Sequence, residues 1–130
     1  MDIPRRATAW LLSAFFIYTG IDHFLRPSWY EPLVFLPSPR FWVLLSGGLE
    51  ILLGLATPFW PRPASAATAG FLVLVYSANL HMWVNQVPMN GRVYSRRWHL
   101  LRLGMQALLI ILELWIGGWI ARAHDTTSYR

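Results

Sequence analysis

Long stretches without charge are the feature that most limits what this chain can fold into. The stretches are residues 7–21, 41–60, 63–91 and 103–121, and the only Asp, Glu, Lys or Arg side chains within them are Glu50 and Glu113. An apolar run of about 18 or more residues is long enough to cross the hydrocarbon core of a bilayer as a helix. The sequence therefore predicts transmembrane helices at about 7–25, 41–57, 65–84 and 100–121.

The composition agrees with a membrane protein. Charged residues make up 13% of the chain, whereas soluble domains carry about 25%. A helix at the surface of a soluble protein presents a polar stripe to water, and residues 65–84 and 103–121 contain no such stripe. The fold class that we predict is an all-α, integral membrane four-helix transmembrane bundle, formed by a single domain that spans residues 1–130. A soluble bundle of very hydrophobic helices is the alternative.

The connections predict how the bundle meets the membrane surface. Residues 26–40 are rich in proline and aromatic side chains, so we expect this loop after the first helix to lie along the interface or to fold back over the bundle. Four spans place both termini on the same side. The arginines divide evenly between the two sides, so only Arg5 and Arg6, before the first span, favour a cytoplasmic N-terminus. The same even division argues against a nucleic-acid partner.

Polar side chains inside the predicted spans are the candidate functional residues. Ionisable residues within a span are costly and usually face the interior of a bundle or a functional cavity. Most of them fall in the half nearer the two longer loops, with Glu50 near the middle. Asn79 and His81 are about 200° apart on their helix, so we do not expect both to point inward. The candidates are His23, Glu50, Asn79, His81, Arg102 and Gln106.

These candidates predict a polar pocket between the helices. Glu50 would form its floor and Arg102 would be the counter-charge. Trp29, Tyr30 and the loop 85–99 would form its roof. Imidazole, carboxylate and amide groups inside an apolar, aromatic cavity suit a quinone, because they bond to its two oxygens while the walls hold the ring and tail. Alternatively, the same groups join the helices through interhelical hydrogen bonds worth about 0.6 kcal/mol each. The sequence leaves both readings open and identifies no catalytic residue.

The cysteine count narrows the choice of cofactor. The chain has no cysteine, which excludes disulfides, thiol catalysis and Cys-ligated metal centres, and we expect no metal site. His23 and His81 lie at similar depth on different spans, but nothing else in the sequence indicates a haem, so we expect none. His99 and His124 lie near helix ends, where we expect solvated side chains. A non-covalently bound quinone is the cofactor that the polar residues favour.

Residues 18–116 resemble the DoxX-like family of membrane proteins. The resemblance rests on a Gly-x-x-His-Phe in the first span, a Ser-Gly-x-x-Glu-Ile-Leu-Leu-Gly in the second, a Pro-Arg turn, an Ala-Asn-x-His-Met in the third and an Arg-Leu-x-x-Gln in the fourth. The matching positions are Gly20, His23, Phe24, Ser46, Gly47, Glu50, Gly54, Pro61, Arg62, Ala78, Asn79, His81, Met82, Arg102, Leu103 and Gln106. The order and spacing of these elements make the resemblance fairly specific.

The resemblance implies a small four-helix protein of the bacterial inner membrane. Members of the wider family are linked to thiosulfate:quinone oxidoreduction and to membrane oxidoreductase complexes. Related four-helix proteins, which include MauE and relatives of vitamin K epoxide reductase, use cysteine pairs that this chain lacks. An oxidoreductase role would therefore need a bound cofactor or a partner protein.

Three functions stay open at this point. The first is a quinone-interacting subunit of a membrane oxidoreductase system, with a membrane or peripheral partner as the source of electrons. The second is a non-catalytic membrane scaffold or assembly subunit. The third is a small transporter of a solute or of protons, in which Asp22, Glu50 and Arg102 would line a path formed by several copies of the chain. The sequence does not decide whether the chain is an enzyme.

Overall fold

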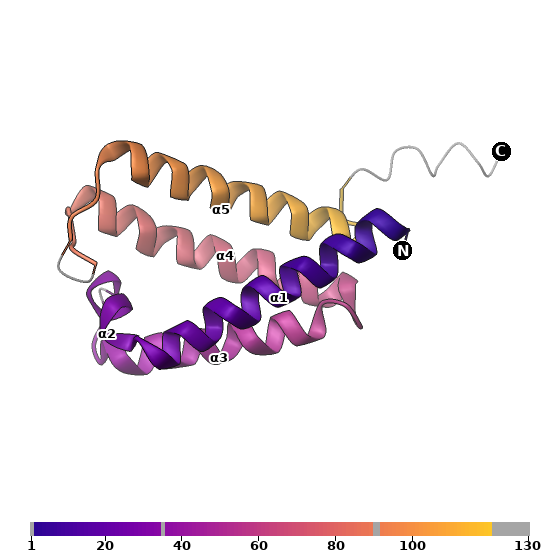
Figure 1. The fold of residues 1–130 in the computed structure, drawn as a ribbon, viewed down its shortest axis with the longest axis horizontal. Coiled ribbons are helices and arrows are strands. Elements are labelled where there is room, and N and C mark those ends of the chain that lie inside the picture. Colours follow the sequence, from indigo (N-terminus) through magenta and orange to yellow (C-terminus); the bar gives the residue numbers. More distant parts are fainter. Residues whose placement is uncertain (1, 35, 90–91, 121–130) are drawn as a thin grey trace.

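A computed structural model describes residues 2–34, 36–89 and 92–120, and these residues are mostly helical. Figure 1 shows the arrangement of the helices. In chain order, the elements are α1 (Ile3–Leu25), α2 (Pro27–Tyr30), the 3-10 helix η1 (Glu31–Leu33), α3 (Pro39–Ala56), α4 (Pro61–Val84) and α5 (Arg96–Ile116). Within the described residues, β-type pairing is limited to one isolated bridge between Met89 and Arg92. The predicted all-α class is confirmed.

Prolines mark where the long helices begin. Proline suits the first turn of a helix, because its missing N–H has no partner there and its φ is already helical. α3 begins at Pro39 and α4 begins at Pro61, whereas α1 has Pro4 in its first turn. The side chain of Asp2 caps α1 by accepting a hydrogen bond of 2.9 Å from the backbone N–H of Arg5. The three helices with such a proline, α1, α3 and α4, therefore begin two to four residues before the predicted spans.

α5 begins and ends earlier than the predicted last span, residues 100–121. α5 begins at Arg96, where the carbonyl of Ser95 accepts a hydrogen bond of 3.2 Å from the backbone N–H of His99. Arginine is a good helix former, so the charges before residue 100 do not delay the helix. α5 ends at Ile116 because Gly118 adopts a positive φ of 74° that a helix does not allow. Residue 121 lies outside the described residues.

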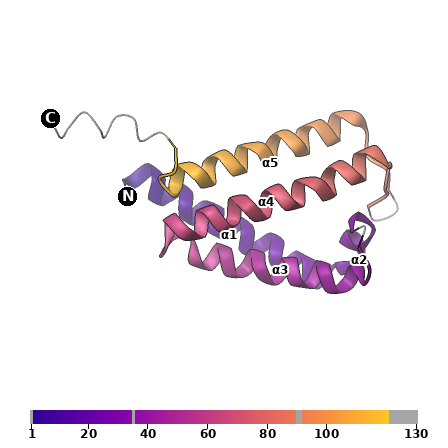
Figure 2. The same cartoon turned by 180° about the vertical axis from the view of Figure 1, so that it is seen from behind.

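The four long helices form two pairs that meet at one end and separate at the other. α1 packs along α3, and α4 packs along α5. The pairs converge where α1 begins and α5 ends, and they diverge toward α2 (Figures 1 and 2). At the converging end, the Arg5 side chain donates a hydrogen bond of 3.2 Å to the carbonyl of Ile116. The hydrophobic core joins α1, α4 and α5, and it consists of Ala9, Leu12, Phe16, Leu72 and Ile116.

Glycines allow α1 and α3 to approach closely. A Cβ atom built on Gly20 would lie 2.7 Å from the carbonyl oxygen of Gly47, and one built on Gly54 would lie 3.0 Å from the carbonyl oxygen of Ser13. The Ser13 hydroxyl donates a hydrogen bond of 2.6 Å to the carbonyl of Gly54. Small residues at such crossings let helix backbones come into contact, as they do in membrane helix pairs.

The outer surface of the helices is apolar. α3, α4 and α5 are each long and apolar enough to cross a membrane. Leu11 and Leu74 are each 72% exposed, and Leu52 is 64% exposed. Soluble monomers rarely expose contiguous apolar surface of this kind, so the surface fits a lipid environment.

The proline-rich segment after α1 folds into α2 and η1, which bury Leu33.

Candidate functional site

A cavity of about 490 Å³ lies in the half of the molecule where the two helix pairs diverge. Its volume falls within the range of about 300–1,000 Å³ that is usual for small-molecule sites. All four long helices contribute to its walls. The apolar part includes Phe15, Phe16, Val43, Phe71, Leu72, Val75, Trp98, Met105 and Leu109. The polar part consists of Thr19, His23, Tyr30, Ser46, Glu50, Asn79, Tyr94 and Arg102.

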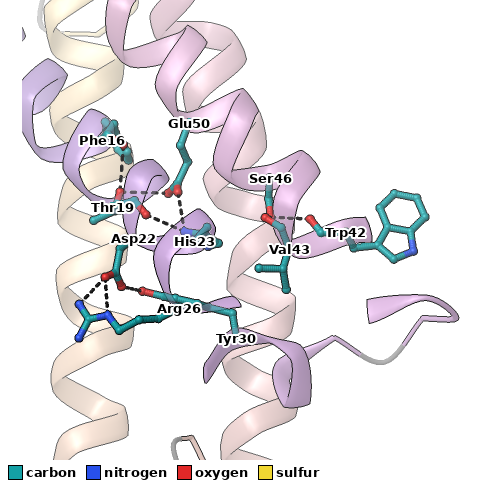
Figure 3. A network of polar contacts seen from close by, with 10 residues as sticks. All are labelled: Phe16, Thr19, Asp22, His23, Arg26, Tyr30, Trp42, Val43, Ser46 and Glu50. Atoms are coloured by element: carbon teal, nitrogen blue, oxygen red, sulfur yellow. Dashed lines mark hydrogen bonds and ion pairs between the residues drawn. The ribbon is translucent and has the colours of Figure 1, made fainter. Parts of the chain in front are cut away.

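On one wall, α1 and α3 hold a cluster formed by Thr19, His23 and Glu50 (Figure 3). Thr19 and His23 are four residues apart on α1 and therefore lie on the same face. The Nδ1 atom of His23 lies 2.7 Å from the carbonyl oxygen of Thr19. A carbonyl oxygen only accepts hydrogen bonds, so Nδ1 carries the proton. In the neutral imidazole, Nε2 is then the acceptor.

The carboxyl of Glu50 is only partly satisfied by this cluster. Its Oε1 atom accepts a hydrogen bond of 3.4 Å from the Thr19 hydroxyl. Its Oε2 atom lies 3.3 Å from His23 Nδ1, but the Nδ1 proton points to the Thr19 carbonyl. Oε2 therefore has no hydrogen-bond partner among the residues that the structure describes. A buried acceptor without a partner costs about 1–3 kcal/mol, so the site is able to accept one more donor.

Tyr30 of α2 covers the His23 side of the cavity. The two rings stack with their centroids 4.0 Å apart and their planes 15° apart. The Tyr30 hydroxyl donates to the carboxylate of Asp22, which also accepts a hydrogen bond of 2.7 Å from Arg26 Nε (Figure 3). Burial and the bond to the negative Asp22 raise the pKa of Tyr30 above its usual range. Asp22 thus holds the covering residue in place and is not itself part of the cavity wall.

The opposite wall comes from α4 and α5. The guanidinium of Arg102 donates hydrogen bonds of 3.2 Å to Asn79 Oδ1 and of 3.2 Å to the sulfur of Met82. A guanidinium has five N–H donors, so these bonds leave donors unused. The Asn79 amide also donates to Gln106 Oε1 at 2.5 Å. Arg102 and Asn79 therefore present a donor-rich surface to the cavity.

The structure brings together some of the predicted site residues and separates others. His23, Tyr30, Glu50, Asn79 and Arg102 all line the cavity. Gln106 lies behind the wall. Its amide donates a hydrogen bond of 2.8 Å to the carbonyl of Leu72 and so joins α5 to α4. The Nδ1 atom of His81 lies 3.0 Å from the Asn85 amide nitrogen, away from the cavity lining. Trp29 stacks against Arg26, whose guanidinium carbon lies 4.2 Å from the ring centroid, and does not line the cavity. The expected roof is therefore formed by Tyr30 and by Met89 and Tyr94 of the segment 85–99.

Two sequence-based expectations about charge need correction. Glu50 and Arg102 do not form the expected pair, because His23 is the partner that lies within ion-pair distance of Glu50. The two helix pairs diverge here and hold the two residues on opposite walls. His99, which we expected to be solvated, is only 4% exposed and stacks on Trp83 at 5.9 Å. α5 begins before His99, so this residue faces α4. His124 lies outside the described residues.

The list of candidate site residues left out several polar side chains that the structure buries or places on the cavity wall. Thr19 and Ser46 line the cavity, and both could have been found because each lies four residues from a candidate, His23 or Glu50, on the same helix face. Glu113 is fully buried at the converging end, and neither carboxyl oxygen has a hydrogen-bond partner in the described part of the chain. No group of three or more His, Asp or Glu side chains suited to a metal ion occurs in residues 2–34, 36–89 and 92–120.

The arrangement is suited to binding a flat, mostly apolar molecule with polar atoms at two ends. An acceptor, the Glu50 carboxyl, faces the cavity from one wall, and a donor, the Arg102 guanidinium, faces it from the other. Aromatic and aliphatic side chains line the cavity between them. A small number of polar groups at defined positions in an apolar cavity is sufficient to orient a ligand.

Comparison with known proteins gives one match. The model of a family described as a domain of unknown function (DUF8561) matches residues 12–117, which include the whole cavity wall. No curated protein and no solved structure matches the chain.

Proposed function

This chain belongs to the DUF8561 family, and we propose that it is a DoxX-like integral membrane protein that binds a quinone in the cavity between its two helix pairs. α1 is the fourth span in this proposal, beside α3, α4 and α5. The observation that carries it is the cavity itself. Its walls are aromatic and aliphatic, and its polar groups, Glu50 with His23 and Arg102 with Asn79, stand on opposite sides.

The chemistry of the Arg102 wall and of the aromatic lining supports a quinone. The Arg102 guanidinium supplies N–H donors for a carbonyl oxygen, and Tyr30 and Trp98 supply aromatic surface for the ring. Arg102 has no carboxylate within ion-pair distance among the described residues. A positive charge in an apolar surrounding is costly without a partner, so a polar ligand oxygen next to it lowers the free energy of the site.

In the cell, the protein would act as a quinone-interacting subunit of an oxidoreductase system in a bacterial inner membrane. The chain has no cysteine, so the electrons would come from a membrane or peripheral partner. The start of α1 lies beside the end of α5. Arg5 and Arg6 favour a cytoplasmic location for this end of the molecule.

The test is equilibrium binding of a short-chain ubiquinone analogue to the protein in lipid nanodiscs, followed by quenching of tryptophan fluorescence. We expect Arg102→Gln to weaken binding about tenfold or more, because a hydrogen bond from a charged group contributes about 1.5–3 kcal/mol. Arg40→Gln is the matched control. Arg40 pairs with Glu31 outside the cavity at 2.7 Å, so its substitution is expected to leave the affinity unchanged. Absence of saturable binding to the wild-type protein would refute the proposal.

A scaffold without a ligand is the second candidate, and the Gln106 bonds favour it. Gln106 joins Asn79 to the backbone of α4, which is what a purely structural polar group does. If the chain is a scaffold, Arg102→Gln and Arg40→Gln leave the quinone titration equally flat, while both proteins still co-purify with the same membrane partner.

A further inference from the structure

The two walls of the cavity differ in hydrogen-bonding character, and this difference distinguishes the two redox forms of the ligand. Building on the proposed function, we infer that the cavity binds the reduced quinol more tightly than the oxidised quinone, with one quinol hydroxyl donating to Glu50 and the other oxygen accepting from Arg102. The preference is a property of these two side chains and does not follow from quinone binding alone.

Glu50 supplies the discrimination. An ionised carboxylate only accepts hydrogen bonds. Both oxygens of a quinone also only accept, whereas both oxygens of a quinol carry a proton that can be donated. The Thr19 hydroxyl donates to Glu50 Oε1, as an accepting carboxylate requires, whereas the His23 Nδ1–H points to the Thr19 carbonyl. Oε2 is buried and has no hydrogen-bond partner in the described residues, so the carboxyl has a lone pair for a quinol hydroxyl once this group turns toward the cavity that Glu50 lines.

Arg102 binds both forms and therefore orients the ring without selecting between them. Its guanidinium donates to Asn79 and Met82 and accepts from nothing. A quinone carbonyl and a quinol hydroxyl oxygen both accept from such a group. The polar side chains that line the cavity from α4, from α5 and from the connection between them are Asn79, Arg102 and Tyr94, so none of the lining residues on this wall is a carboxylate.

The separation of the two charges is what keeps each available to a ligand. If Glu50 and Arg102 were in contact, each would satisfy the other and the cavity would present a neutral pair. Instead, the closest ion-pair partner of Glu50 is His23 on the same wall. The divergence of the helix pairs (Figures 1 and 2) therefore leaves an acceptor and a donor on opposite sides of an apolar space. A quinol, which donates and accepts, fits this pattern better than a quinone.

The experiment compares decylubiquinone with decylubiquinol, kept reduced under anaerobic conditions, on the wild-type protein in nanodiscs. We expect the dissociation constant of the quinol to be about tenfold lower than that of the quinone. A tenfold preference corresponds to about 30 mV for a two-electron couple, so the midpoint potential of the bound ligand is expected to lie about 30 mV above that of the same ligand in nanodiscs without protein.

Two variants assign the preference to its source. Glu50→Gln is nearly the same size but has an amide that donates as well as accepts, so the ratio of the two dissociation constants is expected to fall to within about twofold. Glu31→Gln is the same substitution in a residue that pairs with Arg40 outside the cavity, and it is expected to keep the tenfold ratio. Arg102→Gln is expected to weaken both forms about equally. If Glu50→Gln does not fold, the ratio of the two dissociation constants in the wild type and in Arg102→Gln still tests the quinol preference.

The failure of this inference is distinct from the failure of the proposed function. Equal binding of the two forms, or tighter binding of the quinone, overturns the quinol preference while quinone binding stands. Saturable binding of neither form refutes the proposed function. A tenfold preference that persists in Glu50→Gln overturns the assignment to Glu50.

Discussion

The crossing of α1 and α3 offers a sharp test, because two adjacent glycines occupy very different positions there. A Cβ atom added to Gly47 would lie 2.7 Å from the Cβ of His23 and 2.9 Å from the carbonyl oxygen of Gly20. A Cβ atom added to Gly48 would meet only Phe24, at 3.9 Å, which is ordinary contact. Since the contact with Gly20 is to backbone, no rotation of a side chain relieves it, and Gly47→Ala must push the two helices apart.

The size of the effect follows from the difference between the two variants. Replacing glycine by alanine within a helix stabilises it by about 1 kcal/mol, and this gain is common to both variants. Forcing extra volume into a packed interface costs about 1–3 kcal/mol, and only Gly47→Ala incurs this cost. We therefore expect Gly47→Ala to be about 1–3 kcal/mol less stable than Gly48→Ala, with Gly48→Ala at least as stable as the wild type.

The assay is reversible unfolding in mixed detergent micelles by added SDS, followed by circular dichroism. The two variants have the same composition, so differences in detergent binding to the unfolded chain largely cancel. The same displacement moves His23, so Gly47→Ala is expected to lose affinity for the quinone probe while Gly48→Ala retains it. If Gly47→Ala is as stable as Gly48→Ala, the close approach of α1 and α3 described above is refuted.

Two further predictions concern single polar contacts. Gln106→Leu removes the bonds to Asn79 and to the Leu72 carbonyl, and at about 0.6 kcal/mol per bond within a membrane it is expected to lower the unfolding free energy by about 1 kcal/mol. Ser77→Ala, which loses only a bond to Leu74 within its own helix, is the control, and equal stabilities would contradict the prediction. The raised pKa of Tyr30 means that the folded protein keeps this proton at a pH where the unfolded chain releases it. Stability is therefore expected to fall as the pH rises above about 10. Tyr30→Phe should reduce this fall and remove the last-titrating component of tyrosinate absorbance; an unchanged alkaline titration would contradict it.

The sequence was sufficient to predict the helical architecture, because the sequence signals that start and end helices are local. Charge-free stretches and flanking prolines predicted α3 and α4 to within four residues at each end. The limits of α5 were less well predicted, since Arg96 and Arg97 continue the helix and Gly118 ends it before the apolar composition does. Position along each predicted span also placed most polar side chains in the same half of the bundle, and five of the candidate site and roof residues line one cavity there.

The sequence alone determined the long helices, their apolar surface and the approximate position of each polar side chain along them, because these depend on composition and on a fixed rise and turn per residue. Only the tertiary structure decided which polar groups bond to one another and which face open space. Arg102 and Gln106 lie one turn apart on α5, yet Gln106 bonds to the α4 backbone and Arg102 faces the cavity. The physical reason is the distance between helices. Contacts at the converging end and at the glycine crossing set that distance. The spacing of residues along a single helix gives no information about how far apart two helices lie.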